Sequence, residues 1–237
     1  MATLILLAAG RGSRLGSRTD TLPKCLNSYK DNTLIGHILD HQKNLTQALD
    51  KVVIVTGYQN QKMSELGHIQ VWNANWMNTG PFESLTCAEE FLESESCIVS
   101  YTDLYYSIEF LKSCLDSSAD IFVPNNIRFL DSWRNRQVSI LEDLESFKTN
   151  GKYITEIGKK ITDINLVEGQ FSGLIKIEPK GWKILKRVAS HITNVNLDMT
   201  SLLSNVIEFG YQVETNPVDA FWKEFDEPSD FENITRG

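Results

Sequence analysis

Short apolar runs rich in β-branched residues alternate with longer amphipathic stretches along the first half of the chain. Four such runs predict strands, at residues 3–8, 51–57, 68–72 and 97–101. The stretches at 33–49 and 83–93 place apolar residues at helical spacing and predict helices between these strands. Strands separated by helices of this length indicate βαβ units, hence a mostly parallel sheet with helices on both faces.

The second half of the chain has a different pattern. Alternating segments beside turn signals predict antiparallel strands at 153–157 and 171–177. Further helices are expected at 181–190 and 198–209, with a last strand at 211–218. One Rossmann-like mixed α/β domain over residues 1–237, with a small antiparallel insertion, fits this pattern better than two independent domains.

Composition and charge narrow the class of protein. The chain has 237 residues, of which 41% are hydrophobic and 23% charged, as in ordinary soluble globular proteins. Its net charge of −8 disfavours binding to nucleic acid or to anionic lipid. A small anionic substrate would instead need a local basic pocket and a metal ion.

The cysteines and the apolar runs bear on location. Cys25, Cys87, Cys97 and Cys114 form no C-x-x-C pair and have no histidine at ligand spacing, which favours a reducing, cytoplasmic setting over a zinc site. No apolar run approaches about 18 residues, so no membrane insertion is expected. The N-terminal apolar stretch lacks a basic flank and is interpreted as a buried strand, not a signal peptide.

The first strand leads into a loop of small and basic residues. The loop is Leu7, Ala8, Ala9, Gly10, Arg11, Gly12, Ser13 and Arg14, and Pro23-Lys24-Cys25-Leu26 follows. Small residues let the backbone N–H groups approach a triphosphate, and the basic side chains can contact its oxygens. A P-loop would need Gly-Lys-Ser/Thr, and the dinucleotide fingerprint would need its third glycine one position earlier than Gly16.

The pattern L-A-A-G-x-G-x-R followed by P-K-x-L resembles the signature of the sugar-phosphate and alditol-phosphate nucleotidyltransferases. The resemblance implies that Leu7 to Ser13 hold the nucleotide and that Arg14 grips its triphosphate. It also implies that Lys24 is catalytic, because the family's lysine stabilises the charge that develops at the α-phosphorus. Residues 1–125 would then form the nucleotide-binding half and residues 126–237 the acceptor-binding half.

Phosphoryl transfer between anions requires charge neutralisation, usually by Mg²⁺ held by carboxylates. Asp103 follows the strand at 97–101, where the family has an acidic residue after Gly or Ala and this chain has Thr102. The segment 222–231 resembles the family's closing segment and assigns the second metal ligand to Asp226. Glu224 points to the same face if that stretch is extended. A helix cap is the alternative role for each aspartate.

The resemblance also suggests residues for the base. Thr79, Gly80 and Ser84 match a family segment that meets the nucleobase, although a Gly-Pro turn with an early helical serine explains the same residues.

The acceptor side rests on weaker matches. Lys159 lies in a segment similar to the family's Glu-Lys-Pro element, without its proline, and Gln170 begins a strand similar to one that lines the acceptor pocket. Trp133 and Arg134, with Glu224, are further candidates for contacting the acceptor, and an exposed basic turn is the alternative for the basic ones.

Within the family, the chain is similar to the small cytidylyltransferases for phosphocholine, aminoethylphosphonate or phosphoglutamine. The similarity lies in its compact length and in the Ser-Tyr-Thr-Asp segment at the end of the strand that leads to Asp103. The expected partners are CTP, Mg²⁺ and a small phosphorylated acceptor used in capsule or surface-glycan decoration, with a homodimer allowed. Residue chemistry alone does not separate CTP from UTP. A sugar-1-phosphate nucleotidyltransferase using UTP or dTTP and a non-catalytic nucleotide-binding domain stay open as alternatives.

Overall fold

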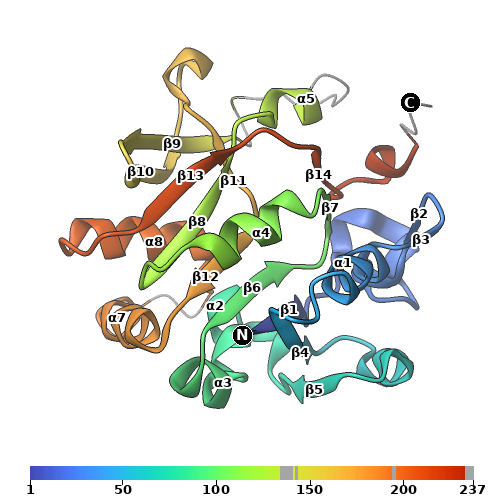
Figure 1. The fold of residues 1–237 in the computed structure, drawn as a ribbon. Coiled ribbons are helices and arrows are strands. Elements are labelled where there is room, and N and C mark those ends of the chain that lie inside the picture. Colours follow the sequence, from blue (N-terminus) through green and yellow to red (C-terminus); the bar gives the residue numbers. More distant parts are fainter. Residues whose placement is uncertain (134–140, 142–143, 194–195, 233–237) are drawn as a thin grey trace.

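A central sheet organises the chain in the computed structural model, which describes residues 1–133, 141, 144–193 and 196–232 (Figure 1). Within those residues the sheet has ten strands. Along the sheet they are β5 (Ile69–Trp72), β4 (Leu49–Thr56), β1 (Ala2–Ala8), β6 (Cys97–Tyr101), β12 (Leu174–Ile177), β8 (Ile121–Asn126), β13 (Glu214–Val218), β10 (Tyr153–Lys160) and β9 (Glu145–Asn150). The tenth, β11 (Gln170–Phe171), pairs with β8.

Most of the sheet is parallel. The strands β5, β4, β1 and β6 pair in parallel, as do β13 and β8. In contrast, β12 runs antiparallel to both of its neighbours, β6 and β8, and β9 and β10 form an antiparallel hairpin that turns at Gly151, whose φ is +61°. The predicted Rossmann-like parallel sheet with antiparallel strands in the second half is therefore confirmed.

Helices cover both faces of this sheet. On one face lie α1 (Leu34–Lys43) and α4 (Glu109–Asp116), and on the other lie α2 (Pro81–Thr86), α3 (Glu89–Ser94), α7 (Pro179–Ala189) and α8 (Met199–Glu208). Side chains of β1 alternate between the two faces of the sheet, which explains why helices pack on both. Leu4 and Leu6 pack on the face of α1 and α4, and Ile5 packs on the face of α2, α3, α7 and α8. Each fully buried large apolar side chain contributes roughly 1.5–3 kcal/mol.

Three predicted elements differ from the structure. The stretch 83–93 is divided at Cys87 and Ala88, so that α3 turns to pack against α7 through Lys186, which contacts Glu89 and Glu93. The stretch 33–49 is helical only to Lys43, where α1 ends.

The strand expected at 171–177 is interrupted by Gly173. This glycine has a φ of +76°, and a Cβ there would lie 2.5 Å from Leu104 Cδ1, so the chain bends between β11 and β12. The strand β8 and the helix α4 were not among the predicted elements.

Small elements gather at the carboxyl edge of the parallel strands. Two short ladders, β7 (Leu104–Tyr106) with β14 (Trp222–Glu224) and β2 (Ser28–Tyr29) with β3 (Asn32–Thr33), lie beside helical turns. The 3-10 turns are η1 (Ser13–Thr19), η2 (Lys24–Leu26), η3 (Asn60–Leu66), η4 (Trp76–Asn78), η5 (Ile164–Leu166) and η6 (Pro228–Phe231), and α5 spans Phe129–Trp133. The β7–β14 ladder brings the C-terminal segment against β6, and the backbone N–H of Phe225 donates to the carbonyl of Asp103 at 2.9 Å.

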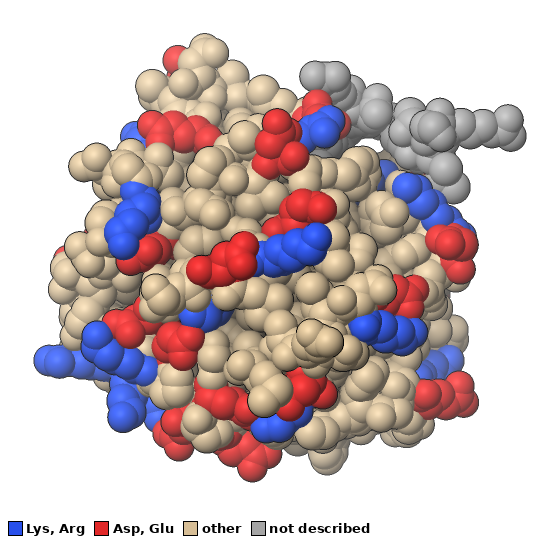
Figure 2. Space-filling view, viewed as in Figure 1, with Lys and Arg blue, Asp and Glu red and all other residues tan. Residues whose placement is uncertain are grey.

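Charged side chains are mixed on the surface. Figure 2 shows basic and acidic residues interspersed over the face drawn, with no continuous area of one sign. Exposed pairs such as Lys51 with Glu95, at 2.8 Å, contribute little to stability, because water screens their charges. Across the described part of the chain, every helix is too short or too polar to traverse a bilayer.

Candidate active site

Lys24 lies at the point where three distant segments meet. The turn η2 presents it, and the side-chain amide of Asn27 holds that turn by donating to the carbonyls of Pro23 at 3.3 Å and Lys24 at 3.1 Å. Lys24 Nζ donates to Asp103 Oδ2 at 2.8 Å and to Asp226 Oδ1 at 2.9 Å, across sequence separations of 79 and 202 residues. One ammonium group therefore joins the N-terminal loop, the end of β6 and the C-terminal segment.

The electrostatics of Lys24 favour its charged form. Burial disfavours the charge, since only 11% of the side chain is exposed, but the carboxylates of Asp103 and Asp226 outweigh burial and raise the pKa of Lys24. Arg14 adds a second cation, 2.9 Å from Asp226 Oδ1. The side chain of Asp226 is only 8% exposed, so removal of its cationic partners would leave a buried negative charge.

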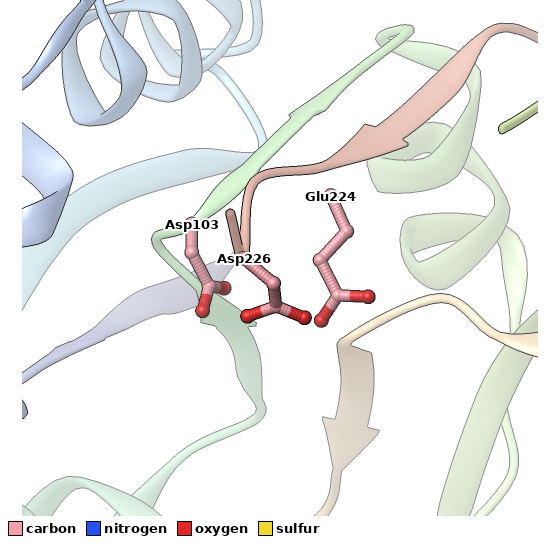
Figure 3. A group of neighbouring side chains, drawn as sticks. All are labelled: Asp103, Glu224 and Asp226. Carbon is pink, nitrogen blue, oxygen red and sulfur yellow. The ribbon is translucent and has the colours of Figure 1, made fainter. Parts of the chain in front are cut away.

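Three carboxylates converge beside Lys24. Figure 3 shows Asp103, at the end of β6, and Glu224 and Asp226, at and after β14, pointing toward a common region. One oxygen from each lies within 4.8 Å of the others. Asp103 Oδ1 is buried and accepts no hydrogen bond from any described residue. Oxygen ligands in this arrangement, one of them without a donor, suit a hard cation such as Mg²⁺.

Asp230 holds the segment that carries Asp226. Its Oδ2 accepts from the backbone N–H groups of Asp226 at 2.8 Å and Glu227 at 2.9 Å, which fixes the turn before η6. Asp230 therefore caps this turn and positions Asp226.

The N-terminal loop packs directly on Lys24. Gly12 has a φ of +70°, and a Cβ there would lie 2.6 Å from Lys24 Cδ. Thr19, which is fully buried, holds the loop by donating to the carbonyls of Gly12 and Gly16, each at 3.2 Å. Arg11 points away to Asp20, at 2.9 Å, whereas Arg14 points to Asp226.

A cavity of about 200 Å³ opens on one side of the carboxylates; we call it the first cavity. Of the residues predicted to bind nucleotide, those that line it are Leu7, Ala9, Gly10, Thr79, Gly80 and Ser84. Trp76, Pro81, Tyr101 and Asp103 complete its wall. The other residues of the same loop do not line this cavity; they are Ala8, Arg11, Gly12 and Ser13.

A second cavity, of about 310 Å³, opens on the other side. Of the predicted site residues, Arg14, Gln170, Glu224 and Asp226 line it. Tyr101 borders both cavities. Lys24 bonds Asp103, which lines the first cavity, and Asp226, which lines the second, so its ion pairs lie between them. The second cavity also exposes Asp198, Glu145 and Trp222, which the sequence did not suggest. Asp198 caps α8, where it accepts from the backbone N–H of Ser201 at 2.7 Å.

The remaining acceptor candidates lie elsewhere. Lys159 is on β10 but does not line the second cavity; its side chain is 53% exposed and its Nζ lies 3.5 Å from Glu208 Oε1. Trp133 ends α5, but its side chain and the whole of Arg134 fall outside the described residues.

A cavity over a small-residue loop, a lysine among carboxylates and a second cavity beyond them are the arrangement expected of a nucleotidyltransferase. Residues 4–149 match the model of the MobA-like NTP transferase domain, and the chain belongs to this family. A similar protein along nearly the whole length is CTP:phosphoglutamine cytidylyltransferase of Campylobacter jejuni, 27% identical over 251 residues, covering 96% of this chain and 97% of that protein.

Two solved structures share the fold. The inositol-1-phosphate CTP transferase of T. maritima superposes with a TM-score of 0.78 at 22% identity, covering 97% of this chain and 91% of its own. The CTP:phosphocholine cytidylyltransferase of Streptococcus pneumoniae has a TM-score of 0.75 at 20% identity, covering 99% of this chain and 98% of its own. The expected family and enzyme class are thereby confirmed, while the roles of individual residues stay predictions.

Proposed function

We propose that this nucleotidyltransferase is a cytidylyltransferase that moves CMP from CTP to a small phosphorylated acceptor and releases pyrophosphate. The observation that carries the proposal is the position of Lys24, whose ammonium group lies among carboxylates between two cavities. In this arrangement the base of CTP occupies the first cavity, its triphosphate lies by Lys24, Arg14 and the carboxylates, and the acceptor occupies the second cavity. Three relatives whose names specify CTP support the choice of nucleotide over UTP or dTTP.

The nucleotide is held by the N-terminal loop and by Thr79, Gly80 and Ser84. Arg14 and Lys24 bind the triphosphate, since guanidinium and ammonium groups form strong charge-assisted bonds to phosphate oxygens. Asp103 and Asp226, with Glu224 beside them, would hold Mg²⁺, which neutralises charge on the phosphates. The unpartnered Oδ1 of Asp103 supports this fit.

The transfer step needs no general base. An oxygen of the acceptor's phosphate or phosphonate, already ionised, attacks the α-phosphorus in line. A new P–O bond forms, the bond between the α-phosphorus and the bridging oxygen breaks, and pyrophosphate leaves with that electron pair. Lys24 stabilises the charge that develops at the α-phosphoryl oxygens, so catalysis consists of positioning and electrostatic stabilisation.

The acceptor is placed against Gln170 and Glu224 in the second cavity, with Lys159, Trp133 and Arg134 as further candidates. Phosphoglutamine and phosphocholine are the first compounds to test, because they appear in the names of two relatives. We place the reaction in the cytoplasm, with the activated product used for capsule or surface-glycan decoration.

The test is pyrophosphate release with CTP, UTP, dTTP and ATP, each against phosphoglutamine, phosphocholine and glucose 1-phosphate in the presence of Mg²⁺. Release with CTP and a phosphorylated amine or amino acid is expected. Faster release with UTP or dTTP and glucose 1-phosphate would instead support a sugar-phosphate nucleotidyltransferase.

A further inference from the structure

Asn73 lies behind two hydroxyl groups of the first cavity. It follows the edge strand β5, is 4% exposed, and donates its backbone N–H to the carbonyl of Thr56 at 2.8 Å. Its Nδ2 lies 2.9 Å from Thr79 Oγ1 and 3.0 Å from Ser84 Oγ. Thr79 and Ser84 both line the first cavity, whereas Asn73 does not.

The orientation of the Asn73 amide is determined by the backbone. The N–H of Asn75, which can only donate, lies 3.0 Å from Asn73 Oδ1. The opposite end of the amide is therefore the NH₂ group, and its two hydrogens are directed to the oxygens of Thr79 and Ser84. Both hydroxyl oxygens consequently act as acceptors toward Asn73.

This arrangement gives the two hydroxyls different roles toward a ligand. Thr79 Oγ1 also lies 3.1 Å from the carbonyl of Asn75, to which it donates its only hydrogen, and so it can offer a ligand only a lone pair. Ser84 Oγ accepts from Asn73 and donates to no described residue, although Ser84 is only 7% exposed. Its hydrogen remains available to a ligand in the cavity.

We propose that Asn73 sets an acceptor at Thr79 and a donor at Ser84, and thereby makes the first cavity select cytosine over uracil. Cytosine presents an amino donor beside the N3 acceptor, which complements this pair. Uracil presents a carbonyl oxygen, which would meet the lone pair of Thr79. Its N3–H could pair with Ser84 only through the second lone pair of that oxygen, which leaves the serine hydrogen turned away without a partner in the base. The inference rests on the proposed function, because it places the base of the nucleotide in the first cavity.

The experiment measures dissociation constants of the Mg²⁺ complexes of CTP and UTP by calorimetry, without any acceptor. The unaltered protein is expected to bind CTP about 10- to 100-fold more tightly, because buried polar groups left unpaired by uracil weaken binding by that order. In the Asn73→Asp variant the side chain can only accept, so both hydroxyls turn their hydrogens to it and offer the base lone pairs. We expect the preference for CTP to fall at least about tenfold.

Asn78→Asp is the matched control. Asn78 is exposed in η4, a few residues along the chain, and its side chain bonds Asn75 without touching Thr79 or Ser84. It adds the same negative charge nearby and should weaken both nucleotides alike, with their ratio unchanged. Ser84→Ala gives a second test, since loss of the hydroxyl should weaken binding of CTP more than binding of UTP.

Different outcomes would contradict the role of Asn73 and the proposed cytidylyltransferase activity. No CTP binding by the unaltered protein would overturn the proposed function and the inference together. Equal binding of CTP and UTP, with pyrophosphate still released, overturns only the role of Asn73. The same conclusion follows if Asn73→Asp and Ser84→Ala both keep the original ratio.

Discussion

At the residue scale, the charges of the site depend on one another. Lys24 and Arg14 share Asp226 Oδ1, and Lys24 also bonds Asp103, so each cation stabilises a carboxylate that is largely buried. A buried ion pair costs desolvation when both partners are present, but removal of one partner leaves an uncompensated charge. The first predictions therefore concern the effect of removing single charges.

Replacing Lys24 by Ala should abolish pyrophosphate release and lower the free energy of unfolding by about 3 kcal/mol in the absence of metal. Added Mg²⁺ should recover more stability in the variant than in the unaltered protein, because carboxylates that have lost the ammonium group of Lys24 need another cation. Urea unfolding with and without Mg²⁺ measures both quantities. Lys43→Ala, which removes only an exposed pair with Asp40, serves as the control. Near-normal turnover by the Lys24 variant would contradict its catalytic role.

Asp103→Asn and Asp226→Asn should each raise the Mg²⁺ concentration needed for half-maximal rate and cut the maximal rate by about 100-fold or more. Each substitution removes a charged ligand from the carboxylate cluster. Titration of Mg²⁺ in the pyrophosphate assay gives the result, with the exposed Asp50→Asn as control. An unchanged Mg²⁺ requirement in both variants would place the metal elsewhere.

Some residues of the site could be predicted from the sequence and others could not. Lys24, Asp103 and Asp226 stand in motifs whose spacing is recognisable, and the structure brings them together. Asn73 acts only through two hydroxyl groups, and Asp198 looks like an ordinary cap, so neither has a local signal. Such roles come from tertiary contacts that a single sequence does not display.

At the scale of elements, the N-terminal loop and the turn that carries Lys24 form one unit. Gly12→Ala should lower turnover at least about tenfold, because the new methyl group must displace the Lys24 side chain that touches it. Gly67→Ala is a matched control: with a φ of +69° and a ψ of +15° it lies in the same left-handed region as Gly12, so the backbone strain is similar, about 1–2 kcal/mol, but nothing lies within 4 Å of the added Cβ. Thermal unfolding and steady-state rates distinguish strain from displacement. Equal loss of activity in both variants would refute the coupling.

The elements that the sequence predicted best are the continuous apolar runs. The residues of β1 and β6 are buried on both faces of the sheet, so their runs have no competing interpretation. The strand β8 contains Pro124, which lacks an N–H and disfavours a central strand. Its pairing with β12 and β13 depends on segments far along the chain, and no local pattern contains that information.

At the scale of the whole molecule, the predicted halves 1–125 and 126–237 share one sheet. The strand β12 from the second half lies between β6 and β8, which both begin in the first. We expect a single cooperative unfolding transition in urea, coincident by circular dichroism and by tryptophan fluorescence. Two separate transitions, or independent folding of residues 1–125, would show that the halves are separate domains. The homodimer stays a prediction, which sedimentation equilibrium can check.

The 202 residues between Lys24 and Asp226 have a consequence for biosynthesis. The lysine is translated 202 residues before its second carboxylate partner. A nascent chain can therefore form β1, β4 and the nucleotide loop long before it has a complete site. A chain whose translation stops before Asp226 should not catalyse the transfer reaction. Only chains that include Asp226 should therefore consume CTP.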